Sequence, residues 1–462
     1  MAPSSTYSVA DVLAVAKIHP FYSDAQYPPP PDDDTILKSR EQAALTYQEG
    51  DLQAQPLLRK KDLYTAIERL VDDTSPQNTY RHNVYTSITG GGGGSKSMFF
   101  ATDAMENRRH RANFGEFLRN TGVIQHGDWV LTTHCAGDLY RSLDLTLEIL
   151  ENAGASLLAA GNYMPVPRVV ELLQSYHVNA LAGDGSQIVK VVQYISTMKT
   201  GRDKIKLNKI IYTSEALNAV QKAHIHAVLG PVKIYSIIGS AEAGPYGANS
   251  PDLTPTDPDA SYTDFVIDTR TNLFEILPQS LGESDGFTTT LPEGETGIIA
   301  QTSLARLRNP LVRYVTGDIG SLHRVPEQAR ALIPEKDWPF MRILRLQGRD
   351  SRFSFSWDGE YIEFDMLKAV MSEPSLGILQ WQAILSTMEP SKEALLEIRM
   401  LCAERNDSLV SRDEIIERLH DFIYVYSSNQ DRFRATFVDD LDGFERSETG
   451  RKVIKFVDRF TN

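Results

Sequence analysis

Strand-like and helix-like runs alternate along the middle of this chain, and this alternation limits the possible folds more than any other feature. Short β-prone runs predict strands over 129–134, 156–160, 180–182, 209–212 and 233–237. Helical spacing fills the intervening segments, 139–152, 167–176, 187–198 and 216–229. Helices of this length bridge parallel strands, so the pattern predicts an α/β fold with a mainly parallel sheet covered by helices. In such sheets the loops after the carboxyl ends of the strands carry the ligand.

The segments on either side have different patterns. Before the alternation, helical spacing within residues 7–72 predicts a helical outer layer over residues 1–80. After it, short β-prone runs separated by turn signals predict a β subdomain near 265–322. The segment 323–341 contains three prolines and is expected to be a loop or insert. From 343 onward, short strands mixed with amphipathic helices predict a separate α+β domain.

The composition is that of a soluble, acidic protein. The 462 residues exceed one ordinary domain, so two or three units are expected. A net charge of −14 disfavours a nucleic-acid partner, because phosphate binding needs clustered Lys and Arg. Cys135 and Cys402 are far apart and predict neither a zinc site nor a disulfide framework. Since no signal peptide or membrane span is apparent, a cytoplasmic protein without a membrane partner is expected, its oligomeric state left open.

A run of five glycines, Gly90 to Gly94, lies between hydroxyl residues and a lysine. Glycine lets main-chain N–H groups turn toward an anion, hydroxyl groups donate hydrogen bonds, and lysine adds positive charge. The segment therefore predicts a phosphate-binding loop for a nucleoside triphosphate. Its candidate ligands are Thr86, Ser87, Thr89, Gly90, Gly91 and Lys96.

The glycine run also allows two other interpretations. A flexible glycine linker is disfavoured, because apolar, β-prone runs flank the glycines. The second is a Walker A loop, from which Gly90–Ser97 differs only by Ser95 in place of the last glycine. A Walker loop opens directly into a helix. Here the helix is expected only at 104–120, after Asp103 as N-cap, so a loop between two strands is predicted and a P-loop phosphotransferase is the weaker alternative.

Five later motifs follow the glycine loop in a characteristic order. They are Tyr212–Leu217, Gly239–Gly244, Arg313–Asp318, Gly348–Asp350 and Ser447–Lys452. With this set the chain resembles the adenylate-forming superfamily of acyl-CoA synthetases and adenylation domains over about residues 60–462. The run Pro310–Ile319 is most similar to the phenylacetate–CoA ligase branch. The resemblance implies an N-terminal domain, 1–349, and a mobile C-terminal lid domain, 350–462, with a hinge at Asp350.

The resemblance also implies a two-step reaction. A carboxylate attacks the α-phosphate of ATP and releases pyrophosphate, and the acyl-AMP then passes its acyl group to a nucleophile. Such chemistry needs neutralised phosphates, a divalent metal and a fixed ribose. ATP and Mg²⁺ are therefore the expected cofactors, with coenzyme A as the expected co-substrate.

Site residues are carried over from the matching motifs. Glu242 is implied as the Mg²⁺ ligand, and a hard cation suits a carboxylate plus phosphate oxygens. Asp318 is implied to accept hydrogen bonds from both ribose hydroxyls, and Arg349 to contact ribose or phosphate. The remaining nucleotide-binding candidates are Ser214, Glu215, Ala216, Gly239, Ser240 and Ala241.

The closing motif departs from the family pattern. The family has a catalytic lysine after the glycine, whereas this chain has Arg451 and then Lys452. Either Lys452 acts through a one-residue shift or Arg451 substitutes for the lysine, although the two side chains are not interchangeable. Two further departures are Ser95 in place of the usual proline and Ile238 in place of the usual aromatic residue.

The acyl pocket is expected near the loop that follows strand 129–134. His134, Tyr140 and Tyr235 are the candidate substrate contacts. The alternative is that these side chains are packed, hydrogen-bonded core residues. The acceptor is expected to enter by the loop 351–363, whose only basic residue is Arg352, so coenzyme A, an amine and a carrier-protein thiol all remain candidates.

Together these features predict an ATP-dependent ligase that activates a small, aromatic carboxylic acid as acyl-AMP. Two alternatives stay open. The departures at Ser95, Ile238 and Arg451 allow a nucleotide-binding regulatory or scaffold protein with an impaired adenylation site. An amine acceptor would make the protein an amide-forming ligase.

Overall fold

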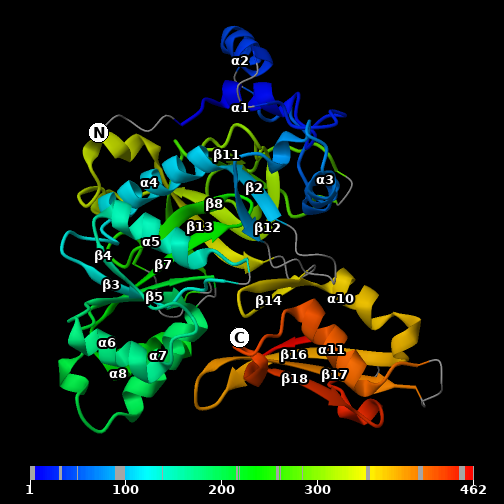
Figure 1. Ribbon diagram of the computed structural model, residues 1–462. Helices are drawn as coiled ribbons and strands as arrows, with labels where there is room; N and C mark the ends of the chain where they lie inside the picture. Colours follow the sequence, from blue (N-terminus) through cyan, green and yellow to red (C-terminus); the bar gives the residue numbers. More distant parts are fainter. Residues whose placement is uncertain are drawn as a thin grey trace.

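The computed structural model describes the chain from residue 6 to residue 460, with several gaps (Figure 1). The residues that it leaves out within this span are 31–33, 49, 89–98, 138, 215, 216, 218, 256–259, 261, 283, 284, 350–353, 404–408 and 447–452.

Helices and strands fall into two groups along the chain. The α-helices are α1 Val9–Ala16, α2 Asp34–Thr46, α3 Lys60–Asp72, α4 Ala104–Asn120, α5 Ser142–Ala153, α6 Val166–Ser175, α7 Gly185–Thr197, α8 Ala219–Leu229, α9 Glu327–Arg330, α10 Phe364–Met371 and α11 Arg412–Ile423. The strands before residue 350 are β1 Val84–Ile88, β2 Phe99–Asp103, β3 Trp129–Thr132, β4 Ser156–Ala159, β5 Ala180–Asp184, β6 Lys209–Thr213, β7 Lys233–Ser240, β8 Gly244–Asn249, β9 Thr263–Asp268, β10 Asn272–Leu277, β11 Gly297–Ser303, β12 Tyr314–Arg324 and β13 Met341–Arg349. The later strands are β14 Ser354–Trp357, β15 Glu360–Glu363, β16 Ile378–Met388, β17 Glu393–Cys402, β18 Phe433–Phe437 and β19 Phe456–Asp458.

An eleven-stranded sheet forms the centre of the larger part of the molecule, in the order β10-β11-β12-β13-β9-β8-β7-β6-β5-β3-β4. Strands β3 to β7 pair in parallel. These are the strands that the alternating pattern predicted, and α5 to α8 connect them in sequence. The predicted α/β fold is therefore confirmed.

Both faces of the parallel half are buried. Successive residues of a strand point to opposite faces. Val130 lies in a hydrophobic cluster with residues of α4 and α5, whereas the next residue, Leu131, lies in a cluster with residues of α6, α7 and α8. The two clusters therefore cover opposite faces of the sheet, as a buried parallel sheet requires.

Strands β8 to β13 extend the same sheet with antiparallel neighbours. The segments of the β subdomain expected near 265–322 form strands, and these strands belong to the same sheet. The sequence marks each segment as β-prone, but the partner of a strand is decided by tertiary contacts. Here the hairpin between β7 and β8 reverses the chain and joins the two halves.

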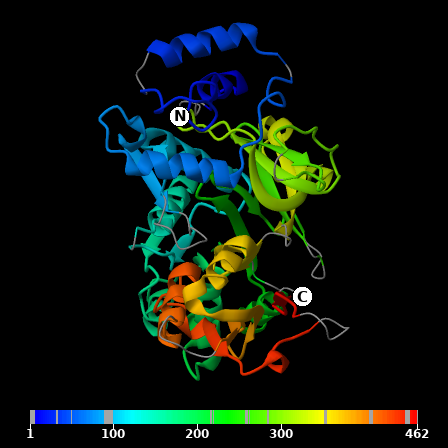
Figure 2. The ribbon, with the colours of Figure 1, turned by 90° about the vertical axis from the view of Figure 1, so that its right-hand side faces the viewer.

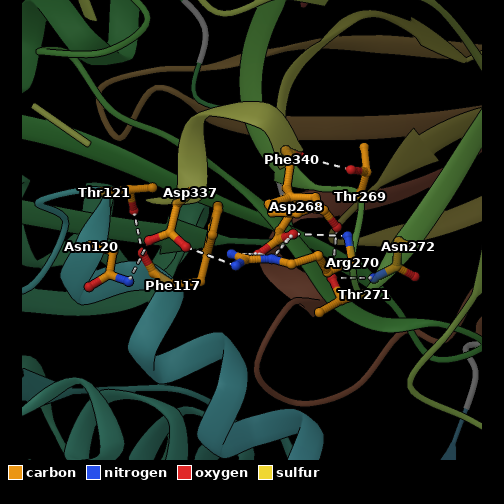
Figure 3. Close-up of polar contacts among 10 residues, drawn as sticks. All are labelled: Phe117, Asn120, Thr121, Asp268, Thr269, Arg270, Thr271, Asn272, Asp337 and Phe340. Atoms are coloured by element: carbon orange, nitrogen blue, oxygen red, sulfur yellow. Dashed lines mark hydrogen bonds and ion pairs between the residues drawn. The ribbon is translucent and has the colours of Figure 1, made fainter. Parts of the chain in front are cut away.

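An ion-pair network around the buried Asp337 fixes the segment between β12 and β13 (Figure 3). Arg270, in the turn after β9, lies 2.6 Å from Oδ2 of Asp268 and 2.8 Å from Oδ1 of Asp337. Asn120, the last residue of α4, donates to Oδ2 of Asp337 at 3.4 Å. The segment expected as a loop or insert therefore packs against the large unit and carries the short helix α9.

Helices α1, α2 and α3 lie within residues 1–80, the range expected as a helical outer layer. Ser8 caps α1 with a reciprocal hydrogen-bond pair to Asp11. Helix α3 buries Leu63, Ile67 and Leu70, the face predicted from their spacing. Helix α2 lies at the outer end of the molecule in both views (Figures 1 and 2).

Residues 354–460 form a C-terminal unit with its own sheet and core. The sheet has four strands in the order β18-β17-β16-β19. Trp357, Leu419 and Phe422 belong to a hydrophobic cluster made only of residues from this unit. Figure 2 shows the unit, coloured yellow to red, below the antiparallel half of the large sheet. No helix in the described part of the chain combines the length and apolar composition of a membrane span.

Candidate active site

The glycine loop joins two antiparallel strands. Strands β1 and β2 pair along their whole length, so residues 89–98 connect the ends of a hairpin. Helix α4 begins only at Ala104, and Asp103 caps it by accepting hydrogen bonds from the N–H groups of the first turn. The predicted strand on each side of the loop is confirmed. The Walker A alternative is wrong, because its lysine would stand at the start of a helix.

Glu242 lies in the turn between β7 and β8, with 9% of its surface exposed. Its Oε1 accepts hydrogen bonds from the hydroxyls of Tyr64 at 3.0 Å and Tyr314 at 2.9 Å. Arg306 donates from Nη1 to its main-chain oxygen. Both tyrosines bind the same carboxylate oxygen, so the carboxylate is held on one side.

The turn that carries Glu242 is tightly built. At Gly239 an added Cβ atom would lie 2.8 Å from Cα of Pro245, so only glycine fits there. The hydroxyl of Ser240 accepts a hydrogen bond from the N–H of Ala243 at 3.1 Å. Ala241 stands between these residues in the turn. The predicted carboxyl-end position of the motif is therefore present in the fold.

Tyr64 connects Glu242 to the glycine-loop hairpin. Its ring contacts the ring of Phe100 on β2 edge-on, with centroids 5.5 Å apart. Tyr314 connects Glu242 to the Arg313–Asp318 motif, of which it is the second residue. Three motifs distant in sequence therefore meet around one carboxylate.

Asp318 and Arg349 are directly opposite each other on β12 and β13. The N–H of Asp318 donates to Oγ1 of Thr316 at 3.1 Å, and Gly317 between them has a φ of +81°. Arg313, at the start of the motif, is fully buried and its Nε lies 3.0 Å from Oε2 of Glu275. Arg313 therefore anchors the motif, while Asp318 lies at a half-buried position beside the strand of Arg349.

A chain of hydrogen bonds joins the carboxyl ends of β3, β5 and β6. Asp184 accepts at Oδ1 from the hydroxyls of Ser214 at 2.9 Å and Thr213 at 3.3 Å. Thr213 Oγ1 in turn lies 2.9 Å from Nε2 of His134. Ser214 has a φ of +65°, the left-handed region that residues other than glycine rarely adopt. Its strained backbone is therefore tied to Asp184.

The three predicted substrate contacts are in different surroundings. His134 is fully buried, and its second nitrogen, Nδ1, lies 2.7 Å from Oγ1 of Thr132. Burial lowers the pKa of His134, which favours a neutral imidazole. Tyr235 is 1% exposed and belongs to the hydrophobic cluster beneath α4 and α5. Both therefore have the packed position that was the alternative interpretation, and their contact with a substrate stays a prediction.

Tyr140 is half-exposed and faces the C-terminal unit. Its hydroxyl donates to Oε1 of Glu360 at 3.2 Å. The negative charge of Glu360 is the largest cause of the raised pKa of Tyr140. Gly359 lies beside this contact, and a Cβ atom added to it would lie 3.4 Å from Cβ of Ser214. The β14–β15 turn thus closes over the ends of β3 and β6.

Several predicted site residues lie outside the described residues. Thr86 and Ser87 are placed on β1, but Thr89, Gly90, Gly91 and Lys96 are not described. The same holds for Glu215, Ala216, Arg451 and Lys452, for the side chain of Arg349 and for the hinge residue Asp350. Their roles stay predictions.

Sequence reasoning missed four residues that organise this region: Asp184, Tyr64, Arg306 and Glu360. Asp184 carried one usable signal, because it ends a strand of the parallel sheet. The other three are outside any motif, and only their partners reveal them. In the described residues no group of three or more His, Cys, Asp or Glu side chains could hold a metal, so a cation here would need oxygens from its ligand as well as Glu242.

The fold of this chain is similar to that of solved ligases that form acyl adenylates, in agreement with the resemblance to the adenylate-forming superfamily. The chain is 18% identical to a 2-hydroxyisobutyryl-CoA ligase crystallised with 2-HIB-AMP and CoA, with a TM-score of 0.70 over 97% of this chain and 87% of that chain. It is 13% identical to the amide bond synthetase McbA from Marinactinospora thermotolerans, with a TM-score of 0.53 over 81% of this chain and 68% of that chain.

One curated relative resembles the chain over nearly its whole length. The indoleacetate–lysine synthetase of Pseudomonas savastanoi is 24% identical over 433 residues, which are 92% of this chain and 95% of that protein. No known family model matches the chain.

The similarity to the 2-hydroxyisobutyryl-CoA ligase differs between its solved states. The TM-score of 0.70 belongs to the 2-hydroxyisobutyryl-CoA ligase in its thioesterification state. Against the same ligase in its postadenylation state the TM-score falls to 0.53, with the same coverage of both chains.

Proposed function

We propose that this protein is an ATP-dependent ligase that activates a carboxylic acid as acyl-AMP, releases pyrophosphate and transfers the acyl group to an acceptor. A small aromatic acid is the proposed substrate class, as expected from the resemblance to the phenylacetate–CoA ligase branch. The similarity to an indoleacetate–lysine synthetase supports this choice.

One observation carries the proposal. Tyr314 links Glu242 to the Arg313–Asp318 motif, and Asp318 stands opposite Arg349 on the neighbouring strand. The residues proposed to contact metal, ribose and phosphate thereby occupy one region of the fold. From first to last they are more than 100 positions apart in the sequence. A random surface carboxylate would not be held by two tyrosine hydroxyls in such a place.

The surroundings of Glu242 fit a magnesium ion held jointly with ATP. Mg²⁺ is usually bound by one or two carboxylates plus substrate phosphates and waters. The hydroxyls of Tyr64 and Tyr314 both donate to Oε1, which orients Glu242 toward a further ligand through Oε2. The bound metal would supply charge neutralisation on the phosphates.

Charges at the junction favour an amine as acceptor over coenzyme A. Asp184, Asp358 and Glu360 surround Tyr140 and Cys135, and each raises the pKa of at least one of these two groups. Arg432 pairs with Asp358 and so offsets one of the three charges. A positively charged amine is attracted to such a region, whereas the phosphates of coenzyme A are repelled. The related proteins include both an indoleacetate–lysine synthetase and a CoA ligase, so both acceptors belong in the test.

The test is product analysis by mass spectrometry. Purified protein is incubated with ATP, Mg²⁺ and a panel of aryl and aliphatic acids, with lysine, simple amines or coenzyme A as acceptor. The proposal expects AMP and pyrophosphate with an amide or a thioester. Asp318→Asn is the variant with impaired activity, and Asp252→Asn, at an exposed residue paired with Lys233, is the matched control.

Each outcome has a clear meaning. AMP together with an amide supports the amine, and AMP together with an acyl-CoA supports coenzyme A. Measurable ATP binding without AMP from any acid would reject the ligase and favour the nucleotide-binding regulatory protein. ADP as product would contradict the adenylation chemistry altogether.

A further inference from the structure

Two hairpin turns of the C-terminal unit contact the large unit. The β14–β15 turn contacts Ser214 and Tyr140 beside the candidate active site. The β16–β17 turn contacts helices α7 and α8 of the large unit instead (Figure 1). This second contact involves no predicted site residue, yet it helps set where the C-terminal unit lies.

Helices α7 and α8 hold the β16–β17 turn at neighbouring residues. Gln221 on α8 donates from Nε2 to the main-chain oxygen of Lys392 at 2.7 Å. Lys190 on α7 has its Nζ 3.5 Å from Oε1 of Glu393 and 3.4 Å from the main-chain oxygen of Ser428. The ammonium group of Lys190 therefore contacts two segments of the C-terminal unit.

Glu393 is a buried carboxylate, with 1% of its surface exposed. Within its own unit, Nε of Arg432 lies 3.4 Å from its Oε1. Arg432 also pairs with Asp358, so its charge is shared between two carboxylates. Desolvation is the main cause of the raised pKa of Glu393. Among the charges that lower this pKa, the ammonium group of Lys190 has the largest effect. A buried charge needs such compensation.

We infer that Lys190 is a positioning residue for the acyl-transfer step. Its ammonium group neutralises Glu393 only while the C-terminal unit is docked as in this structure, so the ion pair favours that docked position. The inference rests on the proposed function and on the TM-scores with the related CoA ligase, 0.70 in its thioesterification state and 0.53 in its postadenylation state. On this inference, adenylation itself does not depend on the contact.

Lys190→Met tests the inference, because it keeps most of the side-chain length and removes the charge. With an acid that the wild-type protein adenylates, transfer of the acyl group from acyl-AMP to the acceptor should slow about tenfold, which corresponds to ~1.4 kcal/mol. Acid-dependent ATP–pyrophosphate exchange should remain at the wild-type rate. Lys190→Arg should restore transfer, and Lys199→Met, at an exposed lysine just beyond α7, should leave both steps unchanged.

Small-angle X-ray scattering provides a readout that needs no chemistry. Lys190→Met should have a larger radius of gyration than the wild type and Lys199→Met, and added salt should expand the wild type toward the variant. An equal loss of exchange and transfer in Lys190→Met would assign Lys190 to general stability and overturn the inference. Unchanged transfer, or unchanged scattering, would overturn it as well.

Failure of the proposed function is distinguishable from failure of this inference. If the wild type catalyses no exchange with any acid, the ligase proposal fails. Scattering would then still show whether Lys190 holds the two units together. A radius of gyration of Lys190→Met equal to that of the wild type would reject this inference, whatever the outcome for the ligase proposal.

Discussion

Tyr140 and Glu360 face each other across the junction between the two units, with the tyrosine hydroxyl donating to Oε1 of the glutamate at 3.2 Å. Burial at the junction raises the pKa of Glu360 from 4.5 to about 7, and the charge of Asp358 adds to this shift. The hydrogen bond from Tyr140 and the charge of Lys60 act in the opposite direction but are smaller. Glu360 therefore changes its charge near neutral pH.

Docking of the C-terminal unit should depend on pH through Glu360. The pKa of Glu360 in the docked arrangement lies above its usual value of 4.5. At a pH below that usual value the protonated carboxyl therefore favours docking fully, and this contribution is lost as the pH rises through about 7. Scattering or limited proteolysis across this range should show the unit released at higher pH. Glu360→Gln should remain docked over the same range, and an unchanged pH profile in this variant would contradict the prediction.

Asp318→Asn should impair ATP use without affecting the fold. The substitution removes the charged acceptor proposed for the ribose hydroxyls, and a hydrogen bond to a charged group is worth roughly 1.5–3 kcal/mol, a loss of about ten- to a hundredfold. ATP–pyrophosphate exchange against ATP concentration measures this loss. Thermal unfolding should match the wild type, and wild-type exchange would refute the ribose assignment.

Tyr314→Phe should raise the magnesium concentration needed for activity. The variant removes one of the two hydroxyls that donate to Oε1 of Glu242, so the carboxylate becomes less well oriented. When exchange is measured against Mg²⁺ concentration, the concentration that gives half of the maximal rate should increase. It should increase more in Glu242→Gln. Tyr246→Phe, a buried tyrosine in the same hydrophobic cluster, is the control and should show the wild-type magnesium dependence.

Asp337→Ala should destabilise the protein without changing its chemistry. Asp337 is 1% exposed and pairs with Arg270, whose guanidinium would lose one of its two carboxylate partners. Removing a buried partner of a charged hydrogen bond costs about 1–3 kcal/mol. Denaturant unfolding measures this cost, and Glu335→Ala in the same segment, which is exposed, should have no comparable effect. Equal stability of the two variants would exclude the proposed role of the network.

The local sequence predicted those parts of the fold that short-range physics decides. The helix over 104–120 after Asp103 has the predicted bounds, because its cap and periodicity lie within the segment itself. The parallel strands β3 to β7 followed from the length of the helices between them. The position of the glycine loop between two strands was also predicted, because the residues on either side of it are β-prone.

Only the tertiary structure decided which side chains meet. Tyr64 and Glu242 are separated by 178 positions and Tyr140 and Glu360 by 220, and no periodic pattern relates such pairs. The sequence likewise did not determine that β8 to β13 extend the sheet with antiparallel strands, because a β-prone segment does not specify its partner. The sequence by itself thus determined the elements and the motif order. The contacts around Glu242, Asp184 and Glu393 depend on packing between distant segments, and folding alone brings these together.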